Sequence, residues 1–214
     1  MPATPPAIPD TQGTRLAEKN RKEQILDAAI ALLQAKGFTN VSTRDLAEHA
    51  GLSRSHIYHY FKDWPTLRRE AFARYSDQQL AEARQAFAGL PARQALASFL
   101  RECLPEAPDG CFTLWLDAWN EALHDGMLAG TYRDVDARWL AWLAELLQQG
   151  VAQGDFICPA PSRAARQIFS MTVGYAEDLL LSPSRQAADN ALDEVLEAAG
   201  LILRVREPLA APPP

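Results

Sequence analysis

The segment VSTRDLAEHAGLSRSHIYHYF, residues 41–61, constrains the fold of this chain more than any other part of its sequence. A hydroxyl at Ser42 or Thr43 predicts the start of a short helix, because a side-chain oxygen there accepts a hydrogen bond from a free backbone N–H of the first turn. Gly51 closes this helix, since glycine permits the left-handed backbone that begins a turn. Ser53 then predicts the start of a second helix. The segment therefore indicates a helix-turn-helix, two helices joined by a tight turn.

The residues on both sides extend this motif to a three-helix unit. Apolar residues recur at helical spacing over residues 21–36, which predicts a helix before the motif. Pro65 favours the first turn of a helix after it, because the missing N–H of proline costs little there. Within the second helix of the motif, Ile57 is the expected core anchor. Tyr60 and Phe61 are expected to pack inward.

The stretch ILDAAIALLQAKGFTNVSTRDLAEHAGLSRSHIYHYFKD closely resembles the DNA-binding domain of the TetR family of bacterial transcriptional repressors. The resemblance covers about residues 19–70 and rests jointly on the apolar period, the glycine positions and the terminal I-Y-x-Y-F. It implies that the second helix of the motif enters the major groove of double-stranded operator DNA. The alternative is a helical protein in which a corner of this shape is incidental.

The resemblance also implies, position by position, which residues contact DNA. It places phosphate contacts at Thr43, Ser53 and Tyr58, with Arg44 and Lys62 as additional contacts, and base contacts at Ser55, His56 and His59, with Arg54 beside them. These residue types suit the roles, because hydroxyls and basic groups bind phosphate oxygens while side chains at the helix start read base edges. The alternative for the two histidines is a surface position without base contact. Trp64 stands where the family usually has Lys, so Lys62 is expected to substitute for that cationic contact.

Charge is unevenly distributed along the chain. Residues 15–75 hold eleven Lys/Arg against seven Asp/Glu, whereas residues 76–214 hold ten against nineteen. All four lysines, Lys19, Lys22, Lys36 and Lys62, precede residue 63. The chain is acidic overall, yet a locally basic surface still attracts a polyanion, because charges further away than about 10 Å are screened. The charge pattern therefore supports DNA binding by the N-terminal part.

Composition narrows the remaining possibilities. No apolar run approaches the ~20 residues that cross a bilayer, and the start MPATPPAIPDTQGT lacks the basic and apolar regions of a secretion signal. The three cysteines, Cys103, Cys111 and Cys158, are odd in number and lack metal-ligand spacing. They predict reduced thiols in a cytoplasm and no metal site. No cofactor is expected. A redox-sensing role for Cys103 or Cys111 is the alternative.

Beyond residue 75 the apolar residues recur every three or four positions, which predicts helices alone. The expected helices span about 65–88, 92–104, 110–126, 131–153, 162–181 and 185–205, with Thr131 and Ser162 as N-caps. The predicted fold is all-α. Its expected parts are a disordered Pro-rich tail at 1–14, the helix-turn-helix DNA-binding domain at 15–64, a larger ligand-binding and dimerisation bundle at 65–206, and a disordered tail at 207–214.

Aromatic residues concentrate on consecutive helices of the larger domain and predict a small-molecule pocket. They are Phe112, Trp115, Trp119, Tyr132, Trp139 and Trp142. A mostly apolar pocket with a few polar groups is the usual form of a small-molecule site, and polar side chains follow Trp119 directly. The predicted pocket comprises Trp115, Trp119, Asn120, His124, Trp142, Phe169 and Tyr175. The alternative is that these aromatics fill a core.

The last two helices are rich in apolar residues, which predicts a homodimer formed through them as a four-helix interface. The alternative is a hairpin that packs only within its own chain. The resemblance implies the same dimer, and the stretch from LWLDAWNEAL to LAELLQQGVAQGDF is loosely similar to the BetI-like kind of C-terminal domain in this family.

The resemblance favours a repressor that a small-molecule inducer releases from a palindromic operator. An enzyme and a regulator that binds only protein are the rival functions. The sequence has no G-x-S-x-G, no Gly-rich phosphate loop and no H-E-x-x-H, so it offers no catalytic constellation. Trp64, which replaces a cationic contact, is the feature that favours the regulator without DNA contact.

Overall fold

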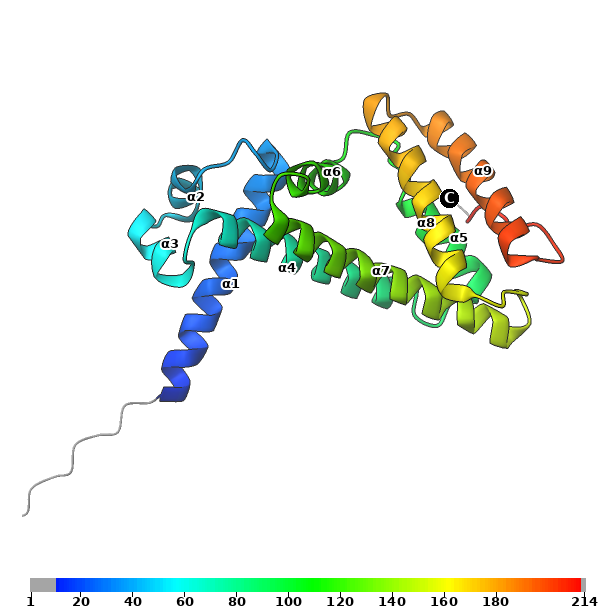
Figure 1. The fold of residues 1–214 in the computed structure, drawn as a ribbon, viewed down its shortest axis with the longest axis horizontal. Coiled ribbons are helices and arrows are strands. Elements are labelled where there is room, and N and C mark those ends of the chain that lie inside the picture. Colours follow the sequence, from blue (N-terminus) through cyan, green and yellow to red (C-terminus); the bar gives the residue numbers. More distant parts are fainter. Residues whose placement is uncertain (1–10, 213–214) are drawn as a thin grey trace, which may run out of the picture.

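The computed structural model describes the backbone of residues 11–212 and the side chains from residue 18 onward. Within this part of the chain every regular element is a helix (Figure 1), which confirms the all-α prediction. The nine helices described are α1 (Thr11–Lys36), α2 (Thr43–Ala50), α3 (Arg54–Tyr60), α4 (Trp64–Ala86), α5 (Ala92–Glu102), α6 (Gly110–Ala122), α7 (Gly126–Gln153), α8 (Pro161–Leu181) and α9 (Arg185–Leu203). Across residues 11–212, none of these helices combines the length and the apolar character needed to span a membrane.

The core of the first three helices continues into later ones. Ile25, Leu46 and Ile57, from α1, α2 and α3, are buried in one cluster with Phe72 of α4 and Leu114 of α6. The predicted domain limit between residues 64 and 65 therefore crosses a continuous apolar core. Helix α6 belongs by sequence to the larger domain and packs against the helix-turn-helix side (Figure 1).

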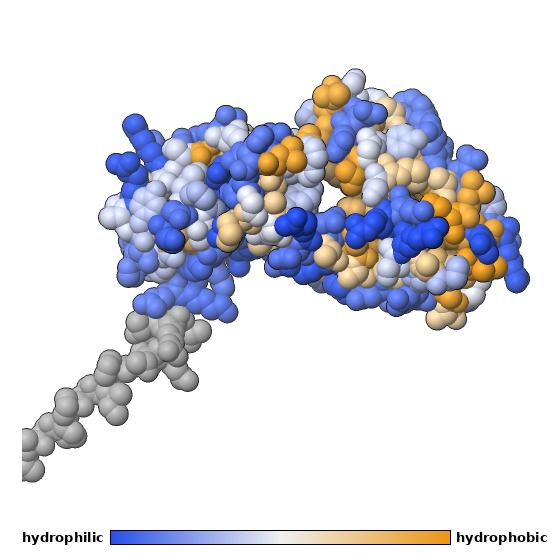
Figure 2. Space-filling view, viewed as in Figure 1, coloured by the Kyte–Doolittle hydropathy of each residue, from blue (hydrophilic) through white to orange (hydrophobic). Residues whose placement is uncertain are grey.

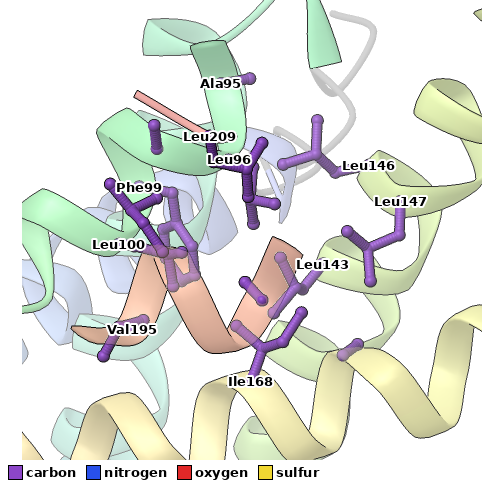
Figure 3. Close-up of a cluster of buried hydrophobic side chains, with 14 of the residues drawn as sticks. Ala95, Leu96, Phe99, Leu100, Leu143, Leu146, Leu147, Ile168, Val195 and Leu209 are labelled. Atoms are coloured by element: carbon purple, nitrogen blue, oxygen red, sulfur yellow. The ribbon is translucent and has the colours of Figure 1, made fainter. Parts of the chain in front are cut away.

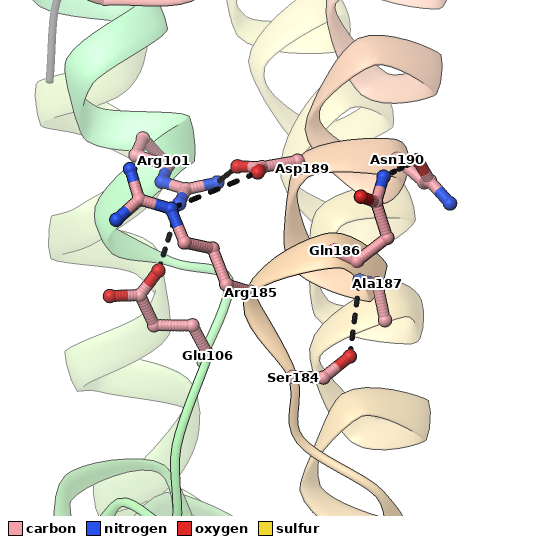
Figure 4. A network of polar contacts seen from close by, with 8 residues as sticks. All are labelled: Arg101, Glu106, Ser184, Arg185, Gln186, Ala187, Asp189 and Asn190. Atoms are coloured by element: carbon pink, nitrogen blue, oxygen red, sulfur yellow. Dashed lines mark hydrogen bonds and ion pairs between the residues drawn. The ribbon is translucent and has the colours of Figure 1, made fainter.

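A second buried cluster fills the larger domain. Leu96, Phe99, Leu143, Ile168 and Val195 bring together α5, α7, α8 and α9 (Figure 3). Polar contacts at its edge join α5 to α9: the guanidinium of Arg101 donates to Asp189 at 2.6 Å and to Glu106 at 3.0 Å (Figure 4). The larger domain is thus a helical bundle with a core of its own.

The ends of the chain differ from the predicted tails. Helix α1 begins at Thr11, ten residues before the predicted start at Arg21, and residues 1–10 lie outside the described part. At the other end, Leu209 is buried in the second cluster, while Arg93 donates to the carbonyls of Glu207 and Pro208 at 2.8 Å. The structure therefore corrects the predicted disorder for residues 207–209. One apolar side chain and two hydrogen-bonded carbonyls fix a proline-rich segment that composition alone marks as disordered.

Two predicted N-caps, Thr131 and Ser162, are also wrong. Helix α7 begins at Gly126 because Asp125 caps it, with Oδ1 accepting from the backbone N–H of residues 127 and 128. Thr131 lies inside this helix and donates to the carbonyl of residue 127. Ser162 lies within the first turn of α8, whose N-cap Ala160 has no side-chain cap bond. The cap at Asp125 outweighs the helix-weakening effect of the glycines at 126 and 130.

Most of the apolar residues that predict an intersubunit surface on α8 and α9 are buried within their own chain. The buried residues are Ala165, Ile168, Ala176, Leu179, Ala188, Leu192, Val195, Leu196, Ala199 and Leu203. The structure therefore favours within-chain packing for these residues. Leu181 and Leu201 remain exposed, at 87% and 75%. In Figure 2 the hydrophobic, orange atoms gather mainly over the larger domain.

Candidate DNA interface and ligand cavity

The turn between α2 and α3 is built by the capping residues that its sequence predicts. Ser42 is the N-cap of α2 and forms a capping box with Asp45, whose carboxylate accepts from the Ser42 backbone N–H at 2.9 Å. Gly51 adopts the left-handed backbone, with φ of 64°, and Ser53 caps α3 by accepting from the backbone N–H of His56. These local bonds fix the direction in which α3 leaves the turn.

Helix α3 buries one side and exposes the other. Ile57 anchors α3 in the core, and Phe61, just after the helix, is buried as well. Eight of the nine predicted DNA-binding residues are exposed: Arg44, Ser53, Arg54, Ser55, His56, Tyr58, His59 and Lys62. The exposed side therefore offers hydroxyl, imidazole and guanidinium groups, which suit phosphate and base-edge contacts.

Thr43 is the exception among the predicted contacts. It is buried, and its hydroxyl lies 3.0 Å from the phenol oxygen of Tyr58. Tyr58 is 45% exposed, so the bond holds the ring of an exposed residue in place. This geometry gives Thr43 the role of orienting Tyr58.

Basic residues of α1 lie beside α3, and the position-by-position prediction does not include them. A shallow depression joins Lys19 and Lys22 to His59 and Tyr60. Lys22 pairs with Glu70 at 2.6 Å, whereas the ammonium of Lys19 is 3.9 Å from a carboxylate of its own helix. The confinement of the lysines to the N-terminal part is the sequence signal that points to them.

Trp64, which stands in place of the usual Lys, opens α4 and packs partly buried against the N-terminal core. Asp63 caps this helix by accepting from the backbone N–H of Thr66 at 2.8 Å. Lys62 is exposed just before the cap. Lys62 is thus an exposed cation at the entry of α4, and the charge of Arg69 acts on the N-cap Asp63 as well.

A cavity of about 700 Å³ lies within the larger domain, with walls from α4, α5, α6, α7 and α8. Figure 2 shows the surface hollowed between the helix-turn-helix side and α8. Of the predicted pocket residues, Trp115, Trp119 and Phe169 line this cavity. Trp119 is 46% exposed, which places it where the cavity meets solvent.

The other four predicted pocket residues lie outside the wall of the cavity. Asn120 and His124 are exposed, and Trp142 is buried within the second core cluster. The hydroxyl of Tyr175 donates to Glu194 of α9. For Trp142 the alternative of a core residue is the one that the structure favours.

Two of the three indole rings in the wall are held from α4. Trp115 Nε1 donates to Gln79 Oε1 at 3.0 Å, and Trp139 Nε1 donates to Ser76 Oγ at 3.1 Å. Trp139 and Tyr132 line the cavity although they are not among the predicted pocket residues. Both belong to the aromatic concentration, but the sequence does not show which side of α7 faces the cavity.

The thiols at the cavity are not activated. Burial raises the pKa of Cys103 far above its usual value, and it also raises the pKa of Cys111. Both thiols therefore stay protonated near neutral pH, whereas a reactive cysteine needs its thiolate form. This environment weighs against the redox-sensing alternative.

Helix α6 connects the cavity to the helix-turn-helix. One side of α6 carries Trp115 in the cavity wall. On another side Asp117 Oδ2 accepts from the backbone N–H of Phe38, in the turn between α1 and α2, at 2.8 Å. Arg68 of α4 donates to the Phe38 carbonyl and to Glu121 of α6, both at 3.2 Å. A displacement of α6 would therefore be transmitted to the turn that positions α2.

Comparisons with known proteins agree with this arrangement. A family model described as bacterial regulatory proteins, tetR family, matches residues 25–67, and one described as BetI-type transcriptional repressor, C-terminal, matches residues 92–203. YfiR of Bacillus subtilis, an uncharacterized HTH-type transcriptional regulator, is 24% identical over 189 residues, which are 85% of this chain and 90% of YfiR. BetI of Serratia proteamaculans is 29% identical over 114 residues, which are 50% of this chain and 57% of BetI.

A solved structure from Saccharomonospora viridis, described as a transcriptional regulator in complex with choline, has the same fold. It superposes with a TM-score of 0.70 at 22% identity and covers 83% of this chain and 94% of that chain.

Proposed function

This chain belongs to the TetR family of bacterial regulatory proteins, and from that premise we propose that it represses transcription until a small-molecule inducer releases it from a palindromic operator. Its family is one of DNA-binding transcriptional regulators. The description of the matching C-terminal model as a repressor supports the direction of regulation. The exposed side chains of α3 support operator binding, with Ser55, His56 and His59 at base edges and Arg54 beside them.

The inducer site in this proposal is the cavity of the larger domain. Its volume of about 700 Å³ suits a small organic molecule, since such sites usually measure about 300–1,000 Å³. The choline complex of the Saccharomonospora viridis protein supports a small-molecule ligand for this fold. Trp115, Trp119 and Phe169 are the predicted pocket residues that we retain for the site.

The observation that carries the proposal is that α6 contacts both the cavity and the turn before α2. A ligand that displaces Trp115 displaces α6, and α6 holds the turn at Phe38 through Asp117. Helix α4 provides a second connection, because it follows α3 directly and its Gln79 holds the Trp115 ring. A ligand changes operator affinity only through its different affinity for the operator-binding and the released states of the protein, typically by about 1–3 kcal/mol.

The DNA-binding form in this proposal is a homodimer through α8 and α9. Two recognition helices about 34 Å apart would enter successive major grooves of a palindromic site. The exposed Leu181 and Leu201 provide apolar surface for the interface. This surface is smaller than the sequence suggests, because most apolar residues of the two helices are already buried.

Binding to DNA upstream of the protein's own gene tests the operator assignment. Arg54→Ala and His59→Ala should each weaken binding by about 1–3 kcal/mol, or about 5- to 150-fold, if the side chain contacts a base. The control is Arg163→Ala, which removes an exposed cation from the start of α8, far along the chain from α3. Gel-shift titrations measure the affinities of wild type and the three variants. Wild-type affinity in both α3 variants would refute the assignment of the exposed side of α3 to the DNA.

A further inference from the structure

The side chains that line the cavity carry negative charge and no positive charge. Five carboxylates line it: four come from four different helices, Glu82, Glu102, Asp136 and Glu177, and the fifth is Asp109, the N-cap of α6. None of the five forms an ion pair with Lys or Arg among the side chains described from residue 18 onward, and no Lys, Arg or His lies in the wall that these side chains form. The adjacent Arg101 is engaged in two ion pairs outside the cavity (Figure 4). The wall therefore has an excess of negative charge.

The aromatic residues of the wall add to this negative potential. The indole N–H groups of Trp115 and Trp139 already donate to side chains of α4, so these two rings offer a ligand their carbon surfaces. The face of an aromatic ring carries negative partial charge and attracts a cation within about 6 Å. Tyr132 lines the cavity beside them, with its ring 5.8 Å from that of Trp115.

Two of the carboxylates act on Tyr132 in the cavity wall. Burial raises the pKa of Tyr132 to about 12, and the charges of Asp136 and Glu177 contribute to the rise. Burial also raises the pKa of Asp136, although the positive charge of Arg166 opposes it. Arg166 is exposed and lies outside the wall. The carboxylates would repel an anion placed here. A cation would instead stabilise their charged forms, in place of the water that burial removes from them.

We propose that the inducer is an organic cation with a bulky apolar body, held by aromatic faces and by Asp136 and Glu177. The inference rests on the proposed function, because it names the ligand class of the same cavity. The apolar body follows from size: the cavity has the volume of a drug-sized ligand, and a small ammonium ion would leave most of it empty.

Two pairs of probes separate charge from shape. Tetraphenylphosphonium and tetraphenylborate share size and shape and differ in the sign of their charge. Choline and 3,3-dimethyl-1-butanol differ in the presence of the charge. Calorimetric titration of the full chain without DNA should show each cation binding at least about tenfold more tightly than its matched compound, with the larger cation binding more tightly than choline.

Two variants locate the charge effect. Asp136→Asn and Glu177→Gln keep the side-chain shape, and each should reduce the preference for cations about three- to fivefold. Glu197→Gln removes an exposed charge from α9, outside the cavity, and should leave the preference unchanged.

Equal affinity within both pairs, or no detectable binding of either cation, would overturn the proposal. So would a preference for cations that neither variant reduces. If the cations bind as expected but leave operator affinity unchanged, the ligand class stands and the inducer mechanism of the proposed function fails.

Discussion

The substitution Gly37→Ala tests the connection between α6 and the helix-turn-helix. Gly37 adopts a φ of +85°, and a Cβ added there would lie 2.9 Å from Asp117 Oδ2. Gly51 provides a matched control, because its φ is +64° and a Cβ added there would meet nothing within 4 Å. The positive φ costs an alanine about 1–2 kcal/mol at either position.

The difference between the two substitutions measures the contact with Asp117. The carboxylate can move away from a new Cβ, but it then loses its hydrogen bond to the Phe38 N–H, which spans 2.8 Å. Such a bond to a charged group contributes about 1.5–3 kcal/mol, and the lower end applies because Asp117 is only half-buried. We therefore expect Gly37→Ala to cost about 3 kcal/mol and Gly51→Ala about 1.5 kcal/mol.

Urea unfolding followed by far-UV circular dichroism measures both losses of stability. In an Asp117→Ala background, where the hydrogen bond is already absent, Gly37→Ala should cost no more than Gly51→Ala. Equal costs of the two glycine substitutions in the wild-type background would refute the reasoning. So would a cost of Gly37→Ala that the loss of the Asp117 carboxylate does not reduce.

Two further predictions concern acid and assembly. Hydrogen bonds from Ser42 and from Thr66 hold the pKa values of Asp45 and Asp63 below their ordinary value of 3.8. The stabilisation from these two carboxylates is therefore fully present above pH 3.8 and is lost as the pH falls through the lowered pKa values. When the unfolding free energy is measured at decreasing pH, Asp63→Asn should lose less of it than wild type. Leu201→Glu should shift the protein from dimer to monomer in light scattering, whereas Leu123→Glu, 61% exposed just after α6, should not; an unchanged dimer in the first variant would contradict the α8–α9 interface.

The helix-turn-helix is predictable because its determinants are local. Ser42, Gly51 and Ser53 act within one turn of helix, so the sequence shows their partners directly. The cavity depends on contacts between helices that are distant in sequence. Trp139 and Trp142 are three residues apart on α7, yet one lines the cavity and the other is core, because α5 and α8 decide which side of α7 is covered.

The prediction of a disordered C-terminal tail failed for residues 207–209 for the same reason. Leu209 is fixed by a core that forms only when α5 and α9 meet, and Arg93 lies more than a hundred residues before the carbonyls it binds. Composition describes a segment in isolation and contains no information about such distant partners.

Helix α6 packs in the core of the first three helices, and this limits how DNA-binding and ligand-binding parts of different regulators can be joined. A chimera that joins the first 64 residues to another ligand-binding domain would separate Ile25 and Leu46 from Leu114, and would expose apolar surface at the joint. An exchange that keeps α4, α6 and the start of α7 with their native partner leaves that packing intact. The ligand specificity of such a regulator should therefore be changed by substituting residues that line the cavity, rather than by exchanging whole domains.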